Sequence, residues 1–509
     1  MKKLSKKIGL FFLAIFALAI IGLVEENLRT KHKWNVHRQA LEQKGEKFDM
    51  ASIIPQIPPE AQNFAMTPFL KPLMEFTNTK NGIVWLDTNA YNRIVNMRSG
   101  LAMNGRENNS KGGSIEKGTF ADLKSCAEFF KGNTNYVNSP LGDTPAEVIY
   151  IALSKFDDEM EELTEAALTR PLGYFPVKYN TNESSWGIML PYLAHVKGLT
   201  ILFQLHGIAV AEIGYSAPKV GTGVGRYSLN DFIVCLRLSD SLKNTPILID
   251  HLVRIATLQL TAQGIREGLW RHSWDERQLL ELERHLALID LLPELKVSLR
   301  GERALTIMSL DHLRRGTDQI TDMGEFKVPM RKLARVVSCA FYENMIAISK
   351  LHQDLIDTCM DENRGVMLTN HTGTLEKFMA KRTTPYNTLT KKLMPAYERV
   401  TIKTARSQAT VNHMKVACAL ERYWLAKNQQ YPTSLNGLVP EFMTKIPIDV
   451  MDGNPVRYRQ TPDGGYVLYS IGWNCVDDGG VTGFKKNRET SKASPDSESG
   501  DWIFSIPKK

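Results

Sequence analysis

The sequence predicts a mainly α-helical protein with an N-terminal transmembrane anchor, a helical body and a small α+β domain at the C-terminus. Three observations indicate this fold class. Residues 8–24 form an uncharged apolar run, and apolar residues recur every three or four positions through the middle of the chain. Two short β-type runs flank a glycine-containing turn near the end. Because 509 residues exceed what one hydrophobic core usually organises, we expect more than one domain.

The N-terminal segment has the features of an export signal. Residues 1–7 contain four lysines and precede the apolar run 8–24, which is close to the lower limit for spanning the hydrocarbon core. The small-residue pattern at 17–19 lies inside this run, so cleavage there would leave an apolar stub. We therefore expect an uncleaved anchor, with a removed signal peptide as the alternative. The lysines favour a cytoplasmic N-terminus, which predicts a single-pass inner-membrane protein whose bulk lies in the periplasm.

The remainder divides into a spacer, a body and a head. The spacer, residues 25–64, begins with a charged stretch that is compatible with a helix and ends in a proline-rich segment with extended conformation. The body covers residues 65–384 and the head residues 385–509. We place the boundary at the polar segment around Pro385, because a proline in such a segment ends helices.

Three consecutive helices are the clearest predictions within the body. Apolar residues recur at helical spacing over 248–269, which is the stripe of an amphipathic helix. A capping-box pattern from Ser273 to Glu276 begins a second helix, Pro293 interrupts it, and a third continues to about Arg315. Short connections between the helices suggest an antiparallel bundle or a short helical array. Further helices are expected around 146–168, 231–242 and 328–360.

The C-terminal region combines one long helix with a hairpin. The chain contains no proline or glycine from Tyr397 to about Asn428, so one helix is expected there, and Pro432 lies just beyond its end. The β-type runs 455–460 and 465–471 are joined by a Pro-Asp-Gly-Gly turn. This order of elements predicts an α+β head.

This region resembles the globular head of the major pseudopilins of type II secretion systems and of related type IV pilin-like proteins. The match covers about 90 residues, under a fifth of the chain. It is carried by Tyr431-Pro432, Gly437-Leu438, Asp452-Gly453-Asn454-Pro455, Tyr458 and Ser470-Ile471-Gly472-Trp473-Asn474. The resemblance implies a Gram-negative-type envelope and a role associated with secretion or envelope assembly.

The resemblance also implies a calcium site in the last loop, where the family binds the cation through backbone carbonyls and aspartates. By position, Ile471 would offer a carbonyl, Asn474 a neutral oxygen where the family has aspartate, and Asp501 a carboxylate. Asp477 and Asp478 are further acidic residues that can replace the missing charge. A hard cation needs several oxygens converging from one loop, and calcium is the possible cofactor that the resemblance implies. The alternative is a turn-rich loop with solvated acidic side chains.

Two departures from the family pattern change the expected role of the head. Ala14 stands at the fifth position after Gly9, where the family has glutamate, and the head begins about 370 residues later. We therefore expect a docking or recognition module and no polymerisation as a pseudopilin subunit. Separately, a polar insertion at 481–500 lies between the calcium-ligand candidates and departs from the family pattern there; its composition is typical of a disordered segment.

The body offers no convincing catalytic motif. The Gly221–Gly225 run lacks dinucleotide-binding spacing, Ser114–Lys117 lacks the partner motifs of serine acyl-enzymes, and the histidines contain no HExxH. Six cysteines without a CxxC pattern indicate no zinc site, and 63 Lys+Arg against 55 Asp+Glu without a basic stripe argue against nucleic-acid binding. The sequence therefore predicts a membrane-anchored extracytoplasmic structural or partner-binding protein. The alternative is a periplasmic hydrolase with its site in the helical body and the head as a docking module.

Overall fold

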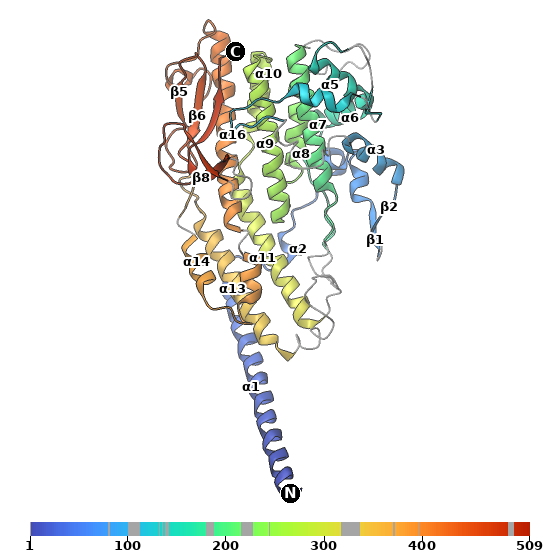
Figure 1. Cartoon of the computed structure of the whole chain (residues 1–509), viewed down its shortest axis with the longest axis vertical. Coiled ribbons are helices and arrows are strands. Elements are labelled where there is room, and N and C mark those ends of the chain that lie inside the picture. The colour runs from blue at the N-terminus through green and yellow to red at the C-terminus, as the bar shows by residue number, and fades with distance from the viewer. Residues whose placement is uncertain are drawn as a thin grey trace.

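The computed structural model shows a long helix projecting from one end of an elongated helical body, with small sheets beside the C-terminal helix (Figure 1). The mainly helical fold, the small antiparallel C-terminal sheets and the N-terminal apolar helix are therefore confirmed. The structure describes residues 2–79, 82–99, 112–131, 133–134, 136–137, 142–179, 188–214, 228–243, 245–316, 336–369, 372–394, 397–486 and 493–508.

Helix α1 (Lys2–Glu42) is one unbroken helix that passes from an exposed to a packed environment. Its apolar residues up to Val24 are exposed, as for Leu10 at 76%, and the helix is long and apolar enough to cross a membrane. From Thr30 onward one face is buried, with Trp34 only 5% exposed. The first part of the predicted spacer is therefore a direct continuation of the anchor helix.

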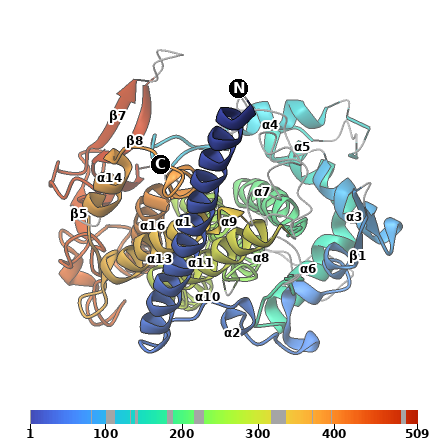
Figure 2. The same cartoon turned by 90° about the horizontal axis from the view of Figure 1, so that it is seen from below.

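The centre of the body is a group of long helices packed side by side (Figures 1 and 2). They are α7 (Tyr192–Ile213), α8 (Ser228–Asp240), α9 (Leu248–Trp270), α10 (Glu276–Ala287), α11 (Leu291–Arg315), α13 (Ser338–Thr358) and α16 (Tyr397–Ala426). Helix α7 is also apolar enough to span a membrane, but most of it is buried within the body, as in the core of a globular protein. The helices predicted around 231–242 and 248–269 are confirmed, as are the helix predicted after the capping-box pattern and the one predicted up to about Arg315, and α13 lies within the helix predicted over 328–360.

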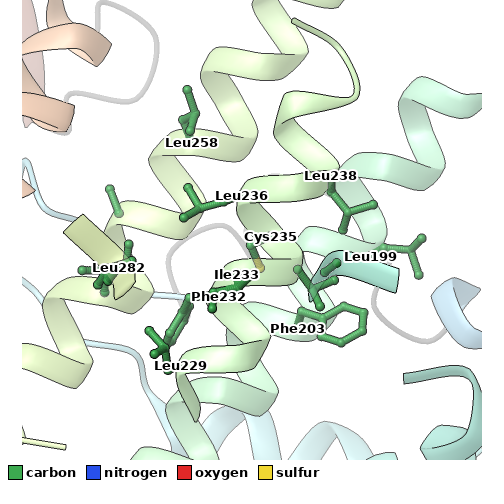
Figure 3. Packing of buried hydrophobic residues seen from close by; sticks show 14 of the residues in the cluster. Leu199, Phe203, Leu229, Phe232, Ile233, Cys235, Leu236, Leu238, Leu258 and Leu282 are labelled. Carbon is green, nitrogen blue, oxygen red and sulfur yellow. The ribbon is translucent and has the colours of Figure 1, made fainter. Parts of the chain in front are cut away.

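Phe232 lies at the centre of the core between α7, α8 and α9. Figure 3 shows it among the apolar side chains around Leu199, Phe203 and Leu282. The helices approach closely because the neighbouring positions are glycines: a Cβ atom at Gly264 would lie 2.2 Å from the Phe232 ring. Such close packing gives the body a rigid centre.

Local signals explain where α10 and α11 begin. Asp275, not Ser273, caps α10 and forms a capping box with Gln278, so the predicted cap is wrong by two residues. Helix α10 ends at Ala287, before Pro293, which instead lies in the first turn of α11. A proline is tolerated there because first-turn N–H groups have no partner within the helix.

A lobe of short elements covers the side of α7 and α8 (Figure 2). It comprises α2 (Met50–Ile53), the 3-10 turns η1 (Glu60–Gln62), η2 (Phe64–Met66) and η3 (Lys71–Met74), the hairpin β1 (Phe76–Thr79) and β2 (Gly82–Trp85), α3 (Thr88–Ser99), α4 (Leu123–Phe130), α5 (Pro145–Leu153), η5 (Ser154–Phe156) and α6 (Asp157–Thr169). The helix predicted over 146–168 is thus two helices joined by a 3-10 turn.

The C-terminal region contains a three-stranded antiparallel sheet in the order β5-β6-β9. Its strands are β5 (Arg457–Gln460), β6 (Tyr466–Ser470) and β9 (Trp502–Ile506), so the predicted hairpin is confirmed. The polar insertion forms a second hairpin, β7 (Thr482–Lys486) and β8 (Ala493–Gly500), so the expectation of a fully disordered insertion is wrong. Smaller elements are β3 (Met360–Asp361), β4 (Val366–Met367), α14 (Thr372–Ala380), α15 (Thr388–Leu393) and η8 (Leu435–Leu438).

Helix α16 belongs to the cores of both the body and the C-terminal sheet. Met414 and Leu420 are fully buried in the same hydrophobic cluster as residues of α8, α9 and α10, and this cluster extends to Tyr466 and Phe504 of the sheet. Arg266 of α9 adds a polar link, because its Nε donates to the Ser505 carbonyl at 2.8 Å. The helix predicted for the head is therefore packed inside the body.

Candidate functional site

The first feature is the contact between α1 and α13, at the end of the body where the apolar part of α1 leaves it. The Asn27 side chain donates to the Val336 carbonyl at 2.9 Å and accepts from the Cys339 backbone N–H at 2.7 Å. Further along, Lys33 pairs with Glu343 at 3.0 Å. The two helices therefore run parallel, and α13 begins about 5 Å beyond the level of Val24, at 1.5 Å per residue.

A second joint fixes the chain just after α1. The Glu46 carboxylate accepts from Arg300 Nη2 at 3.0 Å and from Arg303 Nη2 at 2.6 Å. Burial by itself raises the pKa of Glu46, but the two guanidinium groups outweigh it and leave the pKa below its ordinary value. The Arg303 side chain is fully buried and stacks over the Phe48 ring at 4.7 Å. The N-terminal part of the chain is thus attached to α11 as well as to α13.

Exposed basic side chains surround the point where α1 leaves the body. We call this set the membrane-proximal surface. The segment that carries Lys381 and Arg382 is held at this level because Asn344 donates to the Pro385 carbonyl at 2.9 Å. Tyr386 is 42% exposed and lies near Glu26 and Cys339; partial burial and these neighbours raise its pKa. The surface comprises Arg29, Lys31, Arg315, Lys381, Arg382 and Tyr386.

The residues predicted to bind calcium lie in one loop beside the sheet, and hydrogen bonds connect several of them. Asp501 accepts the backbone N–H of Asp478 at 3.3 Å and that of Gly480 at 2.6 Å. Asn474 donates to the Asp478 carboxylate at 3.3 Å. The structure therefore brings Asn474, Asp478 and Asp501 together. Asp477 is directed elsewhere, because its carboxylate accepts from Arg457 Nε at 2.9 Å.

Asp449 organises this loop. The sequence pattern indicated Asp452 of the same turn and did not identify Asp449. Its fully buried carboxylate accepts from Ser470 Oγ at 2.6 Å, from the Ile471 N–H at 3.0 Å and from Arg457 Nη1 at 3.1 Å. Burial raises the pKa of Asp449, and the hydrogen bonds partly oppose that shift. Its position six residues before Pro455, in the turn that carries the resemblance, could have identified Asp449 from the sequence.

Among the described residues, no group of three or more His, Cys, Asp and Glu side chains is arranged to hold a metal ion. A calcium ion in the C-terminal loop would therefore depend on backbone carbonyls as well as side chains, as the position of Ile471 implies. The Ile471 side chain is buried and its N–H is committed to Asp449, which leaves its carbonyl as the group to consider.

A cavity of about 660 Å³ lies where the body meets the C-terminal region. Its walls come from the end of α10, the start of α11, the β3–β4 turn, α16 and the loop 445–450. Polar contacts fix the walls: Gln408 Oε1 accepts from the Leu291 N–H at 2.7 Å, and Asn412 Nδ2 donates to the Ile448 carbonyl at 3.0 Å. The cavity is therefore built by residues far apart in the sequence.

A buried polar cluster lies within the body. Tyr192 donates to Asp250 Oδ2 at 2.7 Å, and the Thr245 hydroxyl also interacts with this carboxyl. Burial raises the pKa of Asp250 to about 7. Burial also raises the pKa of Glu302, which accepts from the Leu248 N–H at 3.4 Å. A carboxylic acid with such a pKa can give or take a proton near neutral pH, although Asp250 does not line the 660 Å³ cavity.

The other sequence candidates have structural explanations or lie outside the described residues. The Gly221–Gly225 run falls in the part of the chain that the structure does not describe. Ser114 Oγ accepts from the Lys117 N–H at 3.3 Å within a turn, so this pair is a local backbone feature. In the acidic run, Glu162 accepts from the Phe69 N–H at 2.8 Å and joins two parts of the lobe.

Comparisons with known proteins found no matching family model, no matching curated protein and no matching solved structure. The fold by itself defines the class: a mainly helical protein whose N-terminal helix is long and apolar enough to span a membrane, with small antiparallel sheets in the C-terminal region.

Proposed function

We propose that this protein is a single-pass inner-membrane protein that holds a partner-binding body and a pseudopilin-like head in the periplasm. The observation that carries the proposal is the continuity of α1. One helix contains the exposed apolar run and, without a break, the residues packed on α13. An uncleaved anchor of this kind fixes the height and the orientation of everything attached to it.

The membrane-proximal surface supports the same placement. A headgroup layer is about 5–8 Å thick on each side of the hydrocarbon core. Arg29 lies about 8 Å beyond Val24 along the helix, so its side chain reaches this layer. Exposed Lys381 and Arg382 add positive charge that favours anionic lipids. The exposed ring of Tyr386 is a residue type enriched at membrane interfaces.

The experiment that tests the proposal is expression of the full chain in a Gram-negative host, followed by mass spectrometry of its N-terminus. We expect an intact N-terminus, retention in membranes after an alkaline wash, and activity of alkaline phosphatase fused after residue 509. Leu13→Arg with Phe16→Arg should abolish insertion, whereas Val36→Arg with Arg38→Ala, beyond the apolar run, should not. A soluble chain that begins after residue 19 would contradict an anchored function.

Partner binding is tested separately in the same strain. Crosslinking in intact cells, followed by purification of the anchored chain, should recover an envelope protein, and deletion of the insertion 481–500 provides a head variant for comparison. Recovery of the same proteins with an unrelated anchored control would remove the support for partner binding.

We also propose that the C-terminal loop binds calcium, with the Ile471 carbonyl and the side chains of Asn474, Asp478 and Asp501 as ligands. The hydrogen bonds that connect Asn474, Asp478 and Asp501 support this set, because they hold oxygen-bearing groups within one loop. Asp477 belongs to the set only if it leaves Arg457. Calcium would then stabilise the head by binding the folded loop.

A periplasmic hydrolase is the second candidate, and Asp250 is the observation that favours it. A buried carboxyl with a pKa of about 7 suits general acid–base chemistry. Purified full chain would be assayed with ester, amide and glycoside substrates, alongside Asp250→Asn as the inactive variant and Asp158→Asn, at an exposed position of α6, as the control. Turnover that Asp250→Asn leaves unchanged would remove Asp250 from consideration.

A further inference from the structure

The 660 Å³ cavity has two chemically different parts. Apolar walls are supplied by residues such as Ile289, Leu292, Ile446 and Val450. The polar part centres on Lys415, which projects from the middle of α16. Such a combination of apolar walls and a few placed polar groups is typical of ligand sites.

Lys415 is the unusual member of this lining. It makes no hydrogen bond or ion pair with any residue in the described part of the chain, and Asp290 acts on it only at longer range. Burial lowers the pKa of Lys415 and the charge of Asp290 partly opposes the shift. A partly desolvated ammonium without a partner costs folding free energy. An anion bound in the cavity would offset that cost.

The remaining charges around the cavity favour an anion as well. Lys445 also lines the cavity and is exposed. The carboxylate of Glu362 is already neutralised by Lys296, whose Nζ lies 2.6 Å from it. The N-terminus of the 25-residue helix α11 also faces this region, and its dipole attracts negative charge. The negative charge of Asp290 opposes anion binding, but its Oδ1 accepts a hydrogen bond from the Leu292 N–H.

We propose that this cavity binds a ligand in which a carboxylate is attached to an apolar group. The carboxylate lies between Lys415 and Lys445, and the apolar group packs on Leu292 and Ile446. Free fatty acids and the C-terminal ends of peptides with apolar last residues share this chemistry. The site does not depend on the anchor, so it stands even if α1 is cleaved.

The test uses the full chain in lipid nanodiscs and isothermal titration with two pairs of soluble probes. One pair is octanoate and octanamide, and the other is N-acetyl-leucyl-phenylalanine with a free or an amidated C-terminus. We expect binding of at least one carboxylate probe and about ten- to hundredfold weaker binding of its amide. The member that binds identifies the source of the carboxylate.

Lys415→Met separates a binding role from a structural one. It should weaken carboxylate binding by about ten- to hundredfold, since a charge-assisted hydrogen bond is lost. It should also raise the melting temperature of the unliganded chain, because the unpaired ammonium is removed. Lys403→Met, at an exposed position of the same helix, is the matched control and should change neither. Failure of both carboxylates to bind, or equal affinity in Lys415→Met, overturns the proposal.

Discussion

Replacement of Glu46 by alanine should destabilise the body strongly, because it removes the anion that neutralises a buried arginine. Arg303 is fully buried, and Glu46 forms its ion pair among the described residues, whereas the carboxylate of Asp357 acts on it at longer range. Its other contacts are hydrogen bonds to Gln353 Oε1 and to the Lys47 carbonyl, and the Phe48 ring. In Glu46→Ala the guanidinium would remain in the interior without an ion-pair partner.

The magnitude follows from the two arginines that Glu46 binds. Breaking a buried ion pair by removing one partner costs about 3–5 kcal/mol, and the neutral acceptors that Arg303 keeps place the expected loss near the lower end, about 3 kcal/mol. Arg300 is 38% exposed, so its share of the loss is at most about 1 kcal/mol. Because the pKa of Glu46 is lowered on folding, this stabilisation is present above about pH 4.5 and is lost as the pH falls below it.

The assay is urea unfolding of the full chain in non-ionic detergent at pH 7, followed by tryptophan fluorescence. Glu42→Ala is the control, because Glu42 forms an exposed pair with Arg38 on the same helix and should cost about 0.3–0.5 kcal/mol. The double variant Glu46→Leu with Arg303→Met should recover most of the stability, since an apolar pair replaces the charged one. Equal losses in Glu46→Ala and Glu42→Ala would refute the reasoning.

Three further predictions concern titration and calcium. Burial raises the pKa of Asp250 to about 7, so this carboxyl should contribute up to about 4 kcal/mol of stability that is lost as the pH rises from about 4 to 7, measured in urea unfolding as the difference between the unsubstituted chain and Asp250→Asn. His413 should contribute in the opposite direction, because burial lowers its pKa to about 3: about 1.4 kcal/mol of stability per pH unit should be lost below pH 6.5, in addition to the contributions of His251 and His352, and a difference between the unsubstituted chain and His413→Leu that does not change with pH would contradict this. Millimolar calcium should raise the melting temperature of the full chain relative to chelator, and Asp501→Asn should abolish the increase; identical melting of the unsubstituted chain in both buffers would exclude the calcium site.

Features encoded by neighbouring residues could be predicted from the sequence. The hairpin β5–β6 follows from two β-type runs and a Pro-Asp-Gly-Gly turn, and α9 follows from an apolar stripe of period 3.6. The apolar run at the start of α1 predicted a helix that is long and apolar enough to cross a membrane. The polar composition of the insertion 481–500 is typical of a disordered segment, yet its two polar strands pair with each other. Composition alone does not show such pairing.

Features made by distant residues could not be predicted. Trp34 is buried because α13, about 310 residues later, packs against it. Lys415 lies on a helix that is enclosed on nearly every side, so no apolar stripe indicates which of its polar residues are buried. The pKa of Asp250 is raised because packing of several helices buries it; Glu302 adds to the shift, whereas the hydrogen bond from Tyr192 opposes it. These contacts depend on tertiary packing, which has no periodic signature in the sequence.

The packing of α16 determines how the head can act. A docking module on a flexible linker can search for its partner, but here α16 shares its core with α9 and α10 and carries the sheet on its other side. Helices α11 and α13 then connect this core to α1, so the head has a fixed position relative to α1. On the proposed function, in which α1 spans the membrane, a partner would have to present its binding surface at the height and orientation that α1 sets. The proposal therefore restricts the choice of partner by position as well as by surface chemistry.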